Sequence, residues 1–600
     1  MKTEEGNGWS VTWDGSVSLY LRLHPNVEPA LLARKAQSLL DKNIKKTPEG
    51  SERNFSVFFQ EISEIYLGPV MSMEFHQKGD RLYVYIFSIL GLFLIIIAGI
   101  NYINLSIADF HNRSKEIGVR KILGARKNQI ALQIVLESTA FCLFSLLISY
   151  LILYLIFPEL LQKLDPRLSV EMLIEGNVIT TVSIITTLLI LLSTAYPAFQ
   201  LGINKPIGDL KNISGFGNKS SSARTLLVVQ FAISILCISA TLIINNQIDF
   251  IERKDLGYDR HNVITLVMPD EYPTGKAAVL KNQLANLKGV ETVSYSYYHI
   301  TGVPYFKGWY QVELHGEMKQ IELNEVFVDH DYLRAMNIKL VAGRNFDPSN
   351  PADNHTAFIV NETAVRKFGW ADPIGKRITL AVSENNEEKW EGSVIGVVKD
   401  FNTRPLREPI EPLVIRLQYD GFPGYALNVK VNGEITRILP AIKSMYENVL
   451  PGFIADYRLV EDMYNKQYDN ERKALNALQF GTWIIILISS IGIFSLSIYF
   501  SIKRMKEFGI RKVVGAPSWD ISYLHVTDFM RIALLANIFA LPLAYWLMKE
   551  WLDSFAYKVQ LNEFIFPGVA LFSFILVVVS AGYSSIRAGR MNPVDVIKAQ

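Results

Sequence analysis

The sequence predicts an α-helical polytopic membrane protein with seven transmembrane helices and a mixed α/β periplasmic domain. Two observations carry this prediction. The chain contains seven long apolar stretches, and it contains one long polar segment, 247–475, in which short strand-like runs alternate with helical ones. Half of the 600 residues are hydrophobic, so membrane spans are considered before anything else. The length alone exceeds that of a single domain.

The apolar stretches have the length that a membrane span requires. A helix that crosses a bilayer needs about 20 mostly apolar residues. Seven stretches meet this requirement, namely 82–107, 130–157, 177–199, 224–246, 477–500, 522–548 and 564–586. The weakest is 522–548, which holds His525, Asp528 and Arg531 near its start. We expect these three side chains to lie at the membrane interface, because charges in hydrocarbon are costly.

Basic residues in the short loops predict the orientation. They gather in four segments, at 113–127, 205–224, 503–512 and 587–598, whereas the opposite short loops hold only two each. Loops rich in Lys and Arg stay on the cytoplasmic side. Residues 1–80 and 247–475 are then external, which in a bacterial cell predicts a multi-pass protein of the inner membrane with a large domain in the periplasm.

The sequence contains an internal repeat. KEIGVRKILGA at 115–125 and KEFGIRKVVGA at 506–516 share seven of eleven residues, and both follow one apolar stretch and precede the next. A second pair, 195–211 and 582–598, places Pro206 and Pro593 ten residues after a tyrosine, just past a span. The chain therefore consists of two related halves.

The repeat divides the chain into five parts. They are a C-terminal remnant of a first periplasmic domain (1–80), a first membrane domain with three spans (81–215), one further span (216–246), a complete periplasmic domain (247–475) and a second membrane domain with three spans (476–600). In the remnant, strand-like Ser18–Leu23 and the helical stretch 29–44 correspond to Leu427–Val431 and 438–449 of the complete domain. We therefore expect an N-terminal truncation relative to an architecture of eight helices. The alternative is a genuine start at Met1, which leaves a sheet fragment with unpaired edges.

Each repeated segment is predicted to form a short amphipathic helix beneath the membrane. Glu116 and Arg120, and likewise Glu507 and Arg511, are four residues apart with the acid first, which favours a helix. Val119, Ile122 and Leu123 share an apolar face, as do Ile510, Val513 and Val514. Gly124 and Gly515 stand where a C-terminal cap is expected.

We interpret the two segments as coupling helices that dock on a cytoplasmic partner. The residues assigned to them are Lys115, Glu116, Gly118, Arg120, Lys121, Gly124 and Ala125, and then Lys506, Glu507, Gly509, Arg511, Lys512, Gly515 and Ala516. Two copies suit the two protomers of a symmetric dimer. The alternative is a basic interfacial helix that binds anionic headgroups. Repetition of the same residues at the same spacing favours a protein groove, because headgroup binding tolerates a scrambled order.

These motifs, in this order, resemble those of the FtsX/MacB-type ABC transporter permeases. An apolar run, the KEIGVRKILGA segment, two more apolar runs and a cytoplasmic tail with Asn-x-Pro or Asn-Pro are similar to the FtsX-like permease domain. The second external segment resembles the MacB-like periplasmic core domain in four stretches, 257–266, 340–347, 357–378 and 392–415. The duplicated form is similar to permeases of Bacteroidota-type bacteria, and the resemblance covers nearly the whole chain.

The resemblance implies a partner and a mechanism. The partner is a separate cytoplasmic ABC ATPase dimer, which would bind ATP and Mg²⁺ while this chain binds no cofactor. In the family, movement passes through stalk helices to the periplasmic domains, a process called mechanotransmission. A periplasmic adaptor and an outer-membrane channel are further partners compatible with the resemblance.

Motifs for catalysis, metal binding and nucleotide binding are missing from the sequence. The P-loop pattern does not occur, and the nearest stretch, 215–221, lacks its Gly-Lys-Ser/Thr core. HExxH and GxSxG are also missing, the nine histidines show no ligand spacing, and Cys142 and Cys237 lie in apolar runs as packing residues. We predict no catalytic residue and no metal site. A net charge of +2 argues against nucleic acid as a partner. A lone histidine such as His525 is expected at a surface or interface.

Some polar residues have predicted structural roles. Asn101, Asn104 and Glu137 lie in apolar runs, where interhelical hydrogen bonding is favoured over a role in conduction or coupling. Asn361-Glu362 and Asp400-Phe401 are expected to cap turns or helices. The aromatic residues 295–310 (Tyr295, Tyr297, Tyr298, Tyr305, Phe306, Trp309, Tyr310) are interpreted as core and loop residues, with a cargo or partner surface as the alternative.

The most specific prediction is a permease subunit of an ATP-driven efflux or mechanotransmission complex that handles peptides, antibiotics or lipoprotein-like amphiphiles. The alternative is a transmitter that transports nothing and switches a periplasmic cell-wall hydrolase, as FtsX-like proteins do. The large duplicated external domains favour the first, because the cell-division form resembles a smaller single unit. The sequence names neither the cargo nor the direction of its movement.

Overall fold

The computed structural model describes residues 20–24, 27–43, 57–68, 79, 81–164, 170–203, 220–269, 274–301, 306–314, 316–380, 390–417 and 425–590. The chain forms two compact units, Met1–Tyr85 with Pro304–Phe306, and Ile86–Val303 with Lys307–Gln600.

The first unit contains two helices among its described residues. α1 (Pro29–Asn43) confirms the predicted helix, and α2 (Ile62–Ile65) follows it. The amide of Val57 donates to Gln37 Oε1 over 2.7 Å, which fastens the segment before α2 to α1. The predicted strand 18–23 is wrong for Tyr20–Leu23, which form no strand. A lone strand is not stable without a neighbour to complete its backbone hydrogen bonds, and the described part of this unit offers none.

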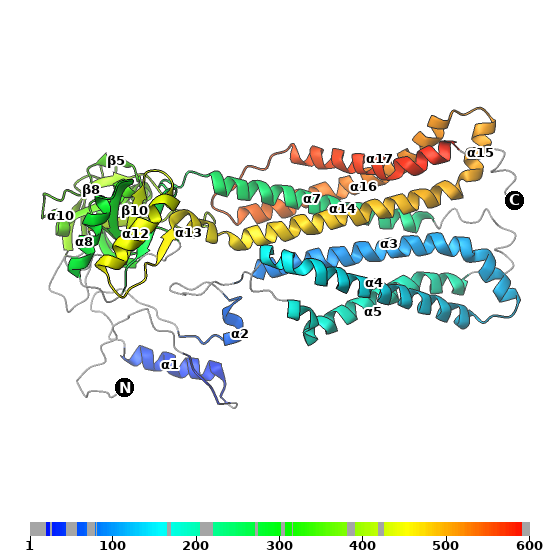
Figure 1. Ribbon diagram of the computed structural model, residues 1–600, viewed down its shortest axis with the longest axis horizontal. Helices are drawn as coiled ribbons and strands as arrows, with labels where there is room; N and C mark the ends of the chain where they lie inside the picture. Colours follow the sequence, from blue (N-terminus) through cyan, green and yellow to red (C-terminus); the bar gives the residue numbers. More distant parts are fainter. Residues whose placement is uncertain are drawn as a thin grey trace. The chain divides into compact units, whose positions relative to one another are not determined.

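Long helices make up the predicted membrane region (Figure 1). They are α3 (Arg81–Ile122), α4 (Lys127–Leu164), α5 (Gly176–Ile203), α7 (Ser220–Arg253), α14 (Asp469–Lys503), α15 (Met505–Val513), α16 (Ser518–Asp553) and α17 (Ile565–Arg590), with the 3₁₀ helix η1 (Val170–Ile174) before α5. Six of the described helices, α3, α4, α7, α14, α16 and α17, are long and apolar enough to cross a membrane. The seventh predicted span is α5, whose described apolar part, Gly176–Leu191, is shorter than a full span. The predicted fold class is thus confirmed, and six of the seven predicted spans are full-length among the described residues.

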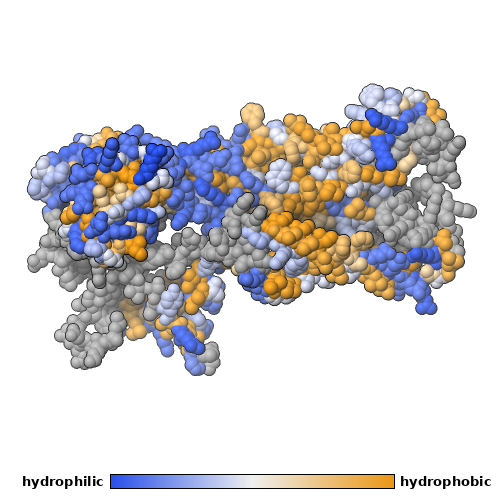
Figure 2. Space-filling model, viewed as in Figure 1, coloured by the Kyte–Doolittle hydropathy of each residue, from blue (hydrophilic) through white to orange (hydrophobic). Residues whose placement is uncertain are grey.

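The membrane helices expose apolar side chains and bury small and polar ones. Hydrophobic residues cover the outer faces of these helices, whereas the sheet domain has a largely hydrophilic surface (Figure 2). α7, α14, α16 and α17 pack on a core in which three alanines of α16, Ala533, Ala536 and Ala540, are almost fully buried. Small residues let helix backbones approach closely, which replaces the hydrophobic driving force that lipid removes.

The periplasmic domain is an eleven-stranded sheet with small helices. Its strands are β1 (Val263–Val267), β2 (Val290–Ser296), β3 (Phe306–Leu314), β4 (Glu317–Val328), β5 (Leu340–Gly343), β6 (Ala357–Asn361), β7 (Arg377–Leu380), β8 (Trp390–Val398), β9 (Leu413–Leu417), β10 (Ala426–Val431) and β11 (Tyr457–Leu459). Its helices are α8 (Thr274–Ala285), α9 (Tyr332–Ala335), α10 (Asp353–Thr356), α11 (Glu362–Phe368), α12 (Ile435–Val449) and α13 (Val460–Lys466). β10 and α12 confirm the strand and helix predicted at 427–431 and 438–449.

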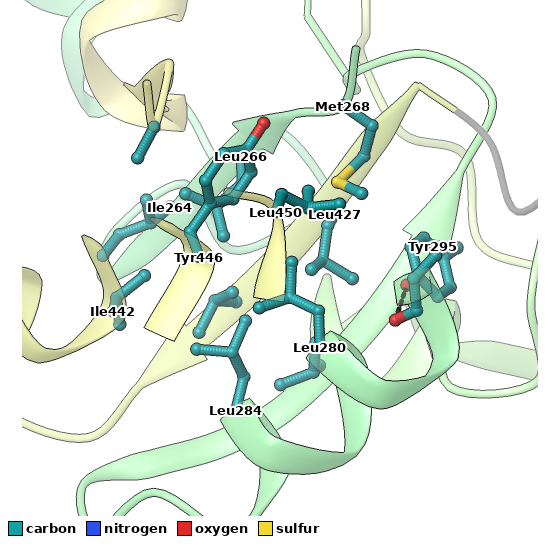
Figure 3. Close-up of a cluster of buried hydrophobic side chains, with 14 of the residues drawn as sticks. Ile264, Leu266, Met268, Leu280, Leu284, Tyr295, Leu427, Ile442, Tyr446 and Leu450 are labelled. Carbon is teal, nitrogen blue, oxygen red and sulfur yellow. Dashed lines mark hydrogen bonds between the residues drawn. The ribbon is translucent and has the colours of Figure 1, made fainter. Parts of the chain in front are cut away.

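The sheet has two parts with separate cores. The order β11-β1-β10-β2-β4-β3-β7-β8-β6-β9, with β9 also pairing β4, closes six strands into a ring and leaves β11, β1, β10 and β2 as an antiparallel extension. Only Ser296 and Val328 pair β2 with β4. Tyr310, Phe358 and Val414 lie in the core of the ring. The extension packs against α8 and α12 through Leu280, Tyr446 and their neighbours (Figure 3).

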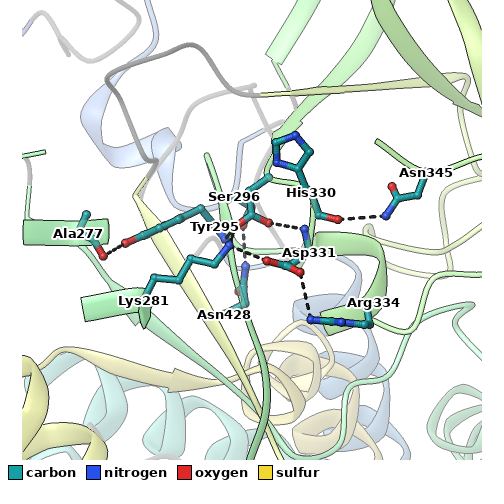
Figure 4. Close-up of polar contacts among 10 residues, drawn as sticks. Ala277, Lys281, Tyr295, Ser296, His330, Asp331, Arg334, Asn345 and Asn428 are labelled. Carbon is teal, nitrogen blue, oxygen red and sulfur yellow. Dashed lines mark hydrogen bonds and ion pairs between the residues drawn. The ribbon is translucent and has the colours of Figure 1, made fainter. Parts of the chain in front are cut away.

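A polar network joins the extension to the segment that follows β4 (Figure 4). Lys281 of α8 pairs with Asp329 at 2.7 Å and with Asp331 at 2.8 Å. Asp329 also accepts a hydrogen bond of 2.7 Å from the amide of Tyr295 in β2. The guanidinium of Arg334 donates a hydrogen bond of 3.1 Å to Asp331 Oδ1. The network holds the two parts of the domain together where sheet pairing is reduced to one residue pair.

Asn361 and Asp400 cap α11, as predicted. Asn361 Oδ1 accepts the amides of Ala364 and Leu413, both at 3.0 Å, so one side chain caps α11 and ties it to β9. Asp400 accepts the amide of Thr363 at 2.9 Å, and Glu362 accepts the amide of Asp400 at 3.0 Å. Among the aromatic residues, Tyr295 and Tyr310 are buried, in agreement with a core role. Tyr305 and the side chain of Phe306 lie outside the described residues.

Candidate coupling site and transmission path

The two repeated segments differ at their start. The first is the continuous end of α3, which runs to Ile122 without interruption, so the prediction of a separate short helix is wrong for this copy. The second is the separate helix α15, because α14 ends at Lys503 and Arg504 leaves helical geometry with φ −95° and ψ 7°. The side chains of Lys115, Glu116, Lys121, Ile122 and Lys506, and residue Gly118, lie outside the part described in atomic detail.

Both copies end in the same cap. Gly124 has φ +96° and Gly515 has φ +100°, a left-handed conformation that glycine adopts without strain. The amide of Ala125 donates to Arg120 O at 2.9 Å, and that of Ala516 donates to Arg511 O at 3.0 Å. This six-residue closure is the Schellman motif. It confirms the predicted caps and explains why Gly-Ala is repeated at this spacing.

The last turn of each copy presents apolar side chains to the outside. Val119 and Leu123 are 56% and 80% exposed, and their counterparts Ile510 and Val514 are 53% and 82% exposed. We call these four residues and Val513, which is 63% exposed, the apolar tips. Within α15, Glu507 pairs with Arg511 at 2.9 Å, the predicted four-residue spacing. In the first copy, Arg120 donates to Gln133 of α4 at 2.8 Å.

Hydroxyl and amide groups form a ladder between α7 and α14. The Ser234 and Ser489 hydroxyls lie 2.9 Å apart, and so do those of Thr241 and Thr482. Gln479 donates to Asn245 at 3.3 Å. As the residue numbers rise in α7 they fall in α14, so the helices run antiparallel. Ser234 and Thr241 also bond to carbonyls of their own helix, at 2.9 Å and 2.8 Å. The two hydroxyls of α7 therefore keep a partner if the helices shift.

The far end of this helix pair meets the periplasmic domain in a junction that also includes the loop between α16 and α17. Gln247 of α7 is fully buried; it donates to Tyr557 O at 3.0 Å and accepts the amide of Val559 at 2.8 Å. The amides of Ala556 and Tyr557 donate to the carbonyls of Arg407 and Leu406, at 3.2 Å and 3.1 Å.

α7 and α14 are held to the periplasmic domain at the same junction. The amide of Leu406 donates to the Tyr468 hydroxyl at 2.8 Å, and Arg407 lies 3.3 Å from Glu471 of α14. Burial raises the pKa of Tyr468, so its hydroxyl keeps its proton. Arg472 pairs with Glu252 of α7 at 2.8 Å. Any movement of α7 or α14 therefore reaches the domain through short, specific contacts.

The polar residues predicted inside the spans have separate roles. Asn101 donates to Ile488 O of α14 at 2.7 Å, which confirms interhelical hydrogen bonding for this residue. Asn104 is 1% exposed, and neither polar atom of its side chain has a described partner. Glu137 accepts Gln133 at 2.9 Å within α4. His525 is 1% exposed, so the expectation of a surface position is wrong for it, because α14, α15 and α17 enclose the cytoplasmic end of α16.

Comparison with known families identifies both kinds of domain. Residues 88–205 and 480–593 match the FtsX-like permease C-terminal family, and 225–417 match the MacB-like periplasmic core domain. The chain is an FtsX/MacB-type ABC transporter permease. The two matches to one family also establish the internal duplication. This permease is therefore a multi-pass membrane protein with a periplasmic core domain.

Similar proteins include archaeal and bacterial transporters. An ABC transporter permease of Methanocaldococcus jannaschii is 24% identical over 340 residues, which cover 53% of this chain and 78% of the relative. The macrolide export ATP-binding/permease proteins MacB of Haemophilus ducreyi and Chromobacterium violaceum are each 22% identical over 46% of this chain. The chain spans 40% and 43% of their lengths.

Solved structures of periplasmic domains also match. The periplasmic region of MacB from Actinobacillus actinomycetemcomitans aligns at 14% identity and a TM-score of 0.26, over 36% of this chain and 96% of that one. The extracellular domain of the ABC-type transporter YknZ from Gram-positive bacteria aligns at 16% identity and a TM-score of 0.24, over 33% and 99%.

Proposed function

We propose that this permease couples a separate cytoplasmic ABC ATPase dimer to its periplasmic domain by mechanical transmission, with ATP and Mg²⁺ bound by the ATPase. One observation carries the proposal: the apolar tips occupy equivalent positions in both repeats, behind identical caps, and are exposed to nearly the same extent. Two equal apolar knobs next to basic side chains fit two equal grooves on a symmetric partner.

Contacts within the second half support a route for the movement. α15 follows α14 directly, α14 runs beside α7 along the hydroxyl ladder, and both helices reach the junction at Gln247, Tyr468 and Glu471. Hydrogen bonds between membrane helices contribute about 0.6 kcal/mol each. These hydrogen bonds are weak, and the α7 residue of each pair has a second partner within α7. The two helices can therefore shift without a large barrier.

The proposal extends to the cargo and the remaining partners. Two relatives bear the name macrolide export protein, and this supports a role in efflux of amphiphilic molecules such as antibiotics or peptides. The periplasmic domain would act on the cargo, together with a periplasmic adaptor and an outer-membrane channel. Cargo would not pass between the membrane helices.

Docking is tested by co-purification of the full chain in detergent with its candidate ATPase subunit. Leu123→Asp combined with Val514→Asp places two charges on the apolar tips, and we expect the ATPase to be lost from the complex. The combination of Arg120→Glu and Arg511→Glu should weaken binding as well. Ile454→Asp is the matched control, because Ile454 is 88% exposed but belongs to the periplasmic domain. Retention of the ATPase by both double variants would refute docking at these helices and favour headgroup binding.

A further inference from the structure

We infer that the two proposed docking helices are mechanically unequal, and that His525 is the positioning residue that ties the second one, α15, to three membrane helices. This inference rests on the proposed function, which supplies the reason for α15 to be held. It concerns how a force applied at α15 enters the helix bundle, whereas the apolar tips concern only where the partner binds.

The backbone already differs between the copies. The first copy continues α3 as one uninterrupted helix of 42 residues, whereas the second is separated from α14 by the break at Arg504. The same cap closes both, so the difference lies at their start. A continuous helix transmits force along its own axis. A helix that is attached through a break needs side-chain contacts to do so.

Phe508 provides the first of these contacts. It is 3% exposed although it belongs to a short helix at the edge of the bundle, and it packs against Ile521 and Leu524 of α16. The centroids of its ring and of the His525 imidazole lie 6.2 Å apart, with an interplanar angle of 85°. Edge-to-face contact of this kind is directional as well as apolar. Phe508 therefore places α15 against the imidazole.

Hydrogen bonds connect His525 to α14 and, through Ser497, to α17. Its Nε2 lies 2.9 Å from Ser497 Oγ, 3.0 Å from Ser501 Oγ and 3.1 Å from the main-chain oxygen of Ser497. That oxygen can only accept, so the network favours the tautomer with the proton on Nε2. Ser497 Oγ also bonds to Ser584 Oγ of α17. One imidazole on α16 thus contacts α15 on one side and reaches α14 and α17 on the other.

Polar tethers hold α15 in the same orientation. Arg504 bonds to Asp528 of α16 and, through Nε, to Glu507 of α15 at 3.1 Å. Lys512, near the other end of α15, donates to Gly589 O of α17 at 2.9 Å. These groups fix the two ends of α15, and Phe508 with His525 fixes its middle.

The first repeat provides an internal comparison. In the register set by Lys115 and Lys506, Ile117 stands in the place of Phe508 and Ile134 in the place of His525. An isoleucine at 134 can neither bond to hydroxyls nor offer an aromatic face. Asp528, in contrast, has an acidic counterpart in Glu137, so the repeat has kept the carboxylate and differs in the imidazole. The inequality therefore resides in His525 and Phe508.

Hydrogen exchange on the full chain tests the tether without reference to the ATPase. His525→Ile gives the second copy the residue of the first, and we expect exchange of the amides of Met505–Val513 to accelerate about tenfold, the loss expected for one stabilising hydrogen bond. His525→Gln keeps a donor for the hydroxyls and should restore part of the protection. Residues 115–122 should not change, and Ile134→Val is the matched control. Unchanged exchange in α15 would overturn the inference.

ATP turnover by the complex tests the positioning role. In His525→Ile we expect permease-stimulated turnover to fall about tenfold while the Kd for the ATPase stays within about twofold, a split that a general loss of structure would not produce. Full stimulation, or an equal loss in turnover and affinity, would overturn the role. Should His525→Ile fail to fold, Phe508→Leu removes the ring contact alone, and the same split is expected at smaller amplitude. If the apolar-tip variants keep the ATPase bound, the proposed docking site is refuted. The hydrogen-exchange result still shows whether His525 holds α15 in place.

Discussion

Buried polar side chains connect the membrane helices through individual hydrogen bonds. Asn537 of α16 donates to Ser573 of α17 at 2.8 Å, and Asn101 of α3 donates to a carbonyl of α14. Gly492 lies beside Asn101: a Cβ there would overlap Asn101 Oδ1 and approach Gln230 Nε2 to 2.9 Å. In hydrocarbon, each of these groups lacks water as an alternative partner, so its place inside the bundle is fixed by chemistry as well as by packing.

His299, three residues after the end of β2, gives a residue-scale prediction about pH. Burial, together with the positive charge of Arg458, lowers the pKa of His299 to about 4. In the unfolded chain the pKa is near 6.5. Between these values the unfolded chain binds a proton that the folded chain does not, so protons favour unfolding. The stability that His299 provides is therefore complete above pH 6.5 and is lost as the pH falls towards 4.

The measurement is the unfolding temperature of the full chain between pH 8 and 4. We expect the wild type to lose stability more steeply below pH 6.5 than His299→Gln, whose side chain does not titrate. Above pH 7 the two curves should run parallel. Equal slopes below pH 6.5 would show that His299 is protonated as readily in the fold as outside it.

At the scale of elements, the α7–α14 pair is stabilised by close approach more than by its individual hydrogen bonds. Ser489→Ala removes one rung, and we expect it to lower the free energy of unfolding by about 0.6 kcal/mol. Gly492→Val should destabilise the bundle by at least 1 to 3 kcal/mol, because the side chain has no room beside Asn101 and Gln230. Ser495→Ala is the control, since that hydroxyl donates to Ile491 O within α14 and its residue is only partly buried. Thermal unfolding in detergent measures all three. A larger effect for Ser489→Ala than for Gly492→Val would contradict this order.

Some features of the helices and strands could be predicted from the sequence, and others could not. Composition and period predicted the spans, the capping glycines and the Asn361 cap, because each depends on residues within one segment. The break at Arg504 could not be predicted in this way, because the segment that follows it, 506–516, is repeated at 115–125, where α3 continues without a break. In the second half the helix after the break packs through Phe508 against His525, which is distant in sequence. One available signal was the aromatic Phe508 in the place of Ile117, since the other three differences between the repeated segments exchange one aliphatic residue for another.

Closure of the six-stranded ring escaped prediction for a related reason. The parallel pairing of β4 with β9 joins Asn324–Val328 to Leu413–Leu417, across a long stretch of chain that leaves no local pattern. The junction residues Gln247 and Arg407 were missed as well. Gln247 follows two asparagines at the end of an apolar run, and Arg407 lies in a polar loop. Such side chains are common on protein surfaces, and only tertiary contacts distinguish a junction from a surface.

Across the second half of the molecule, Gln247 determines whether the loop between α16 and α17 moves with α7. Gln247→Ala removes the acceptor of the Val559 amide, and we expect that amide to exchange about tenfold faster, as for the loss of one hydrogen bond. Gln247→Glu keeps an acceptor and loses only the bond to Tyr557 O, so Val559 should stay protected. Ala556 and Tyr557, whose amides are held by Arg407 and Leu406, should keep their rates in both variants.

The pattern of exchange separates two kinds of junction. Faster exchange at Val559 alone means that the loop has two independent attachments, one to α7 and one to the domain, so that a shift of α7 pulls on α16 and α17 directly. Faster exchange at all three amides means that Gln247 holds a single cooperative unit, and the second half then moves as one body. Protection of Val559 in Gln247→Ala would contradict both, and would leave the contacts at Leu406 and Arg407 as the link between that loop and the periplasmic domain.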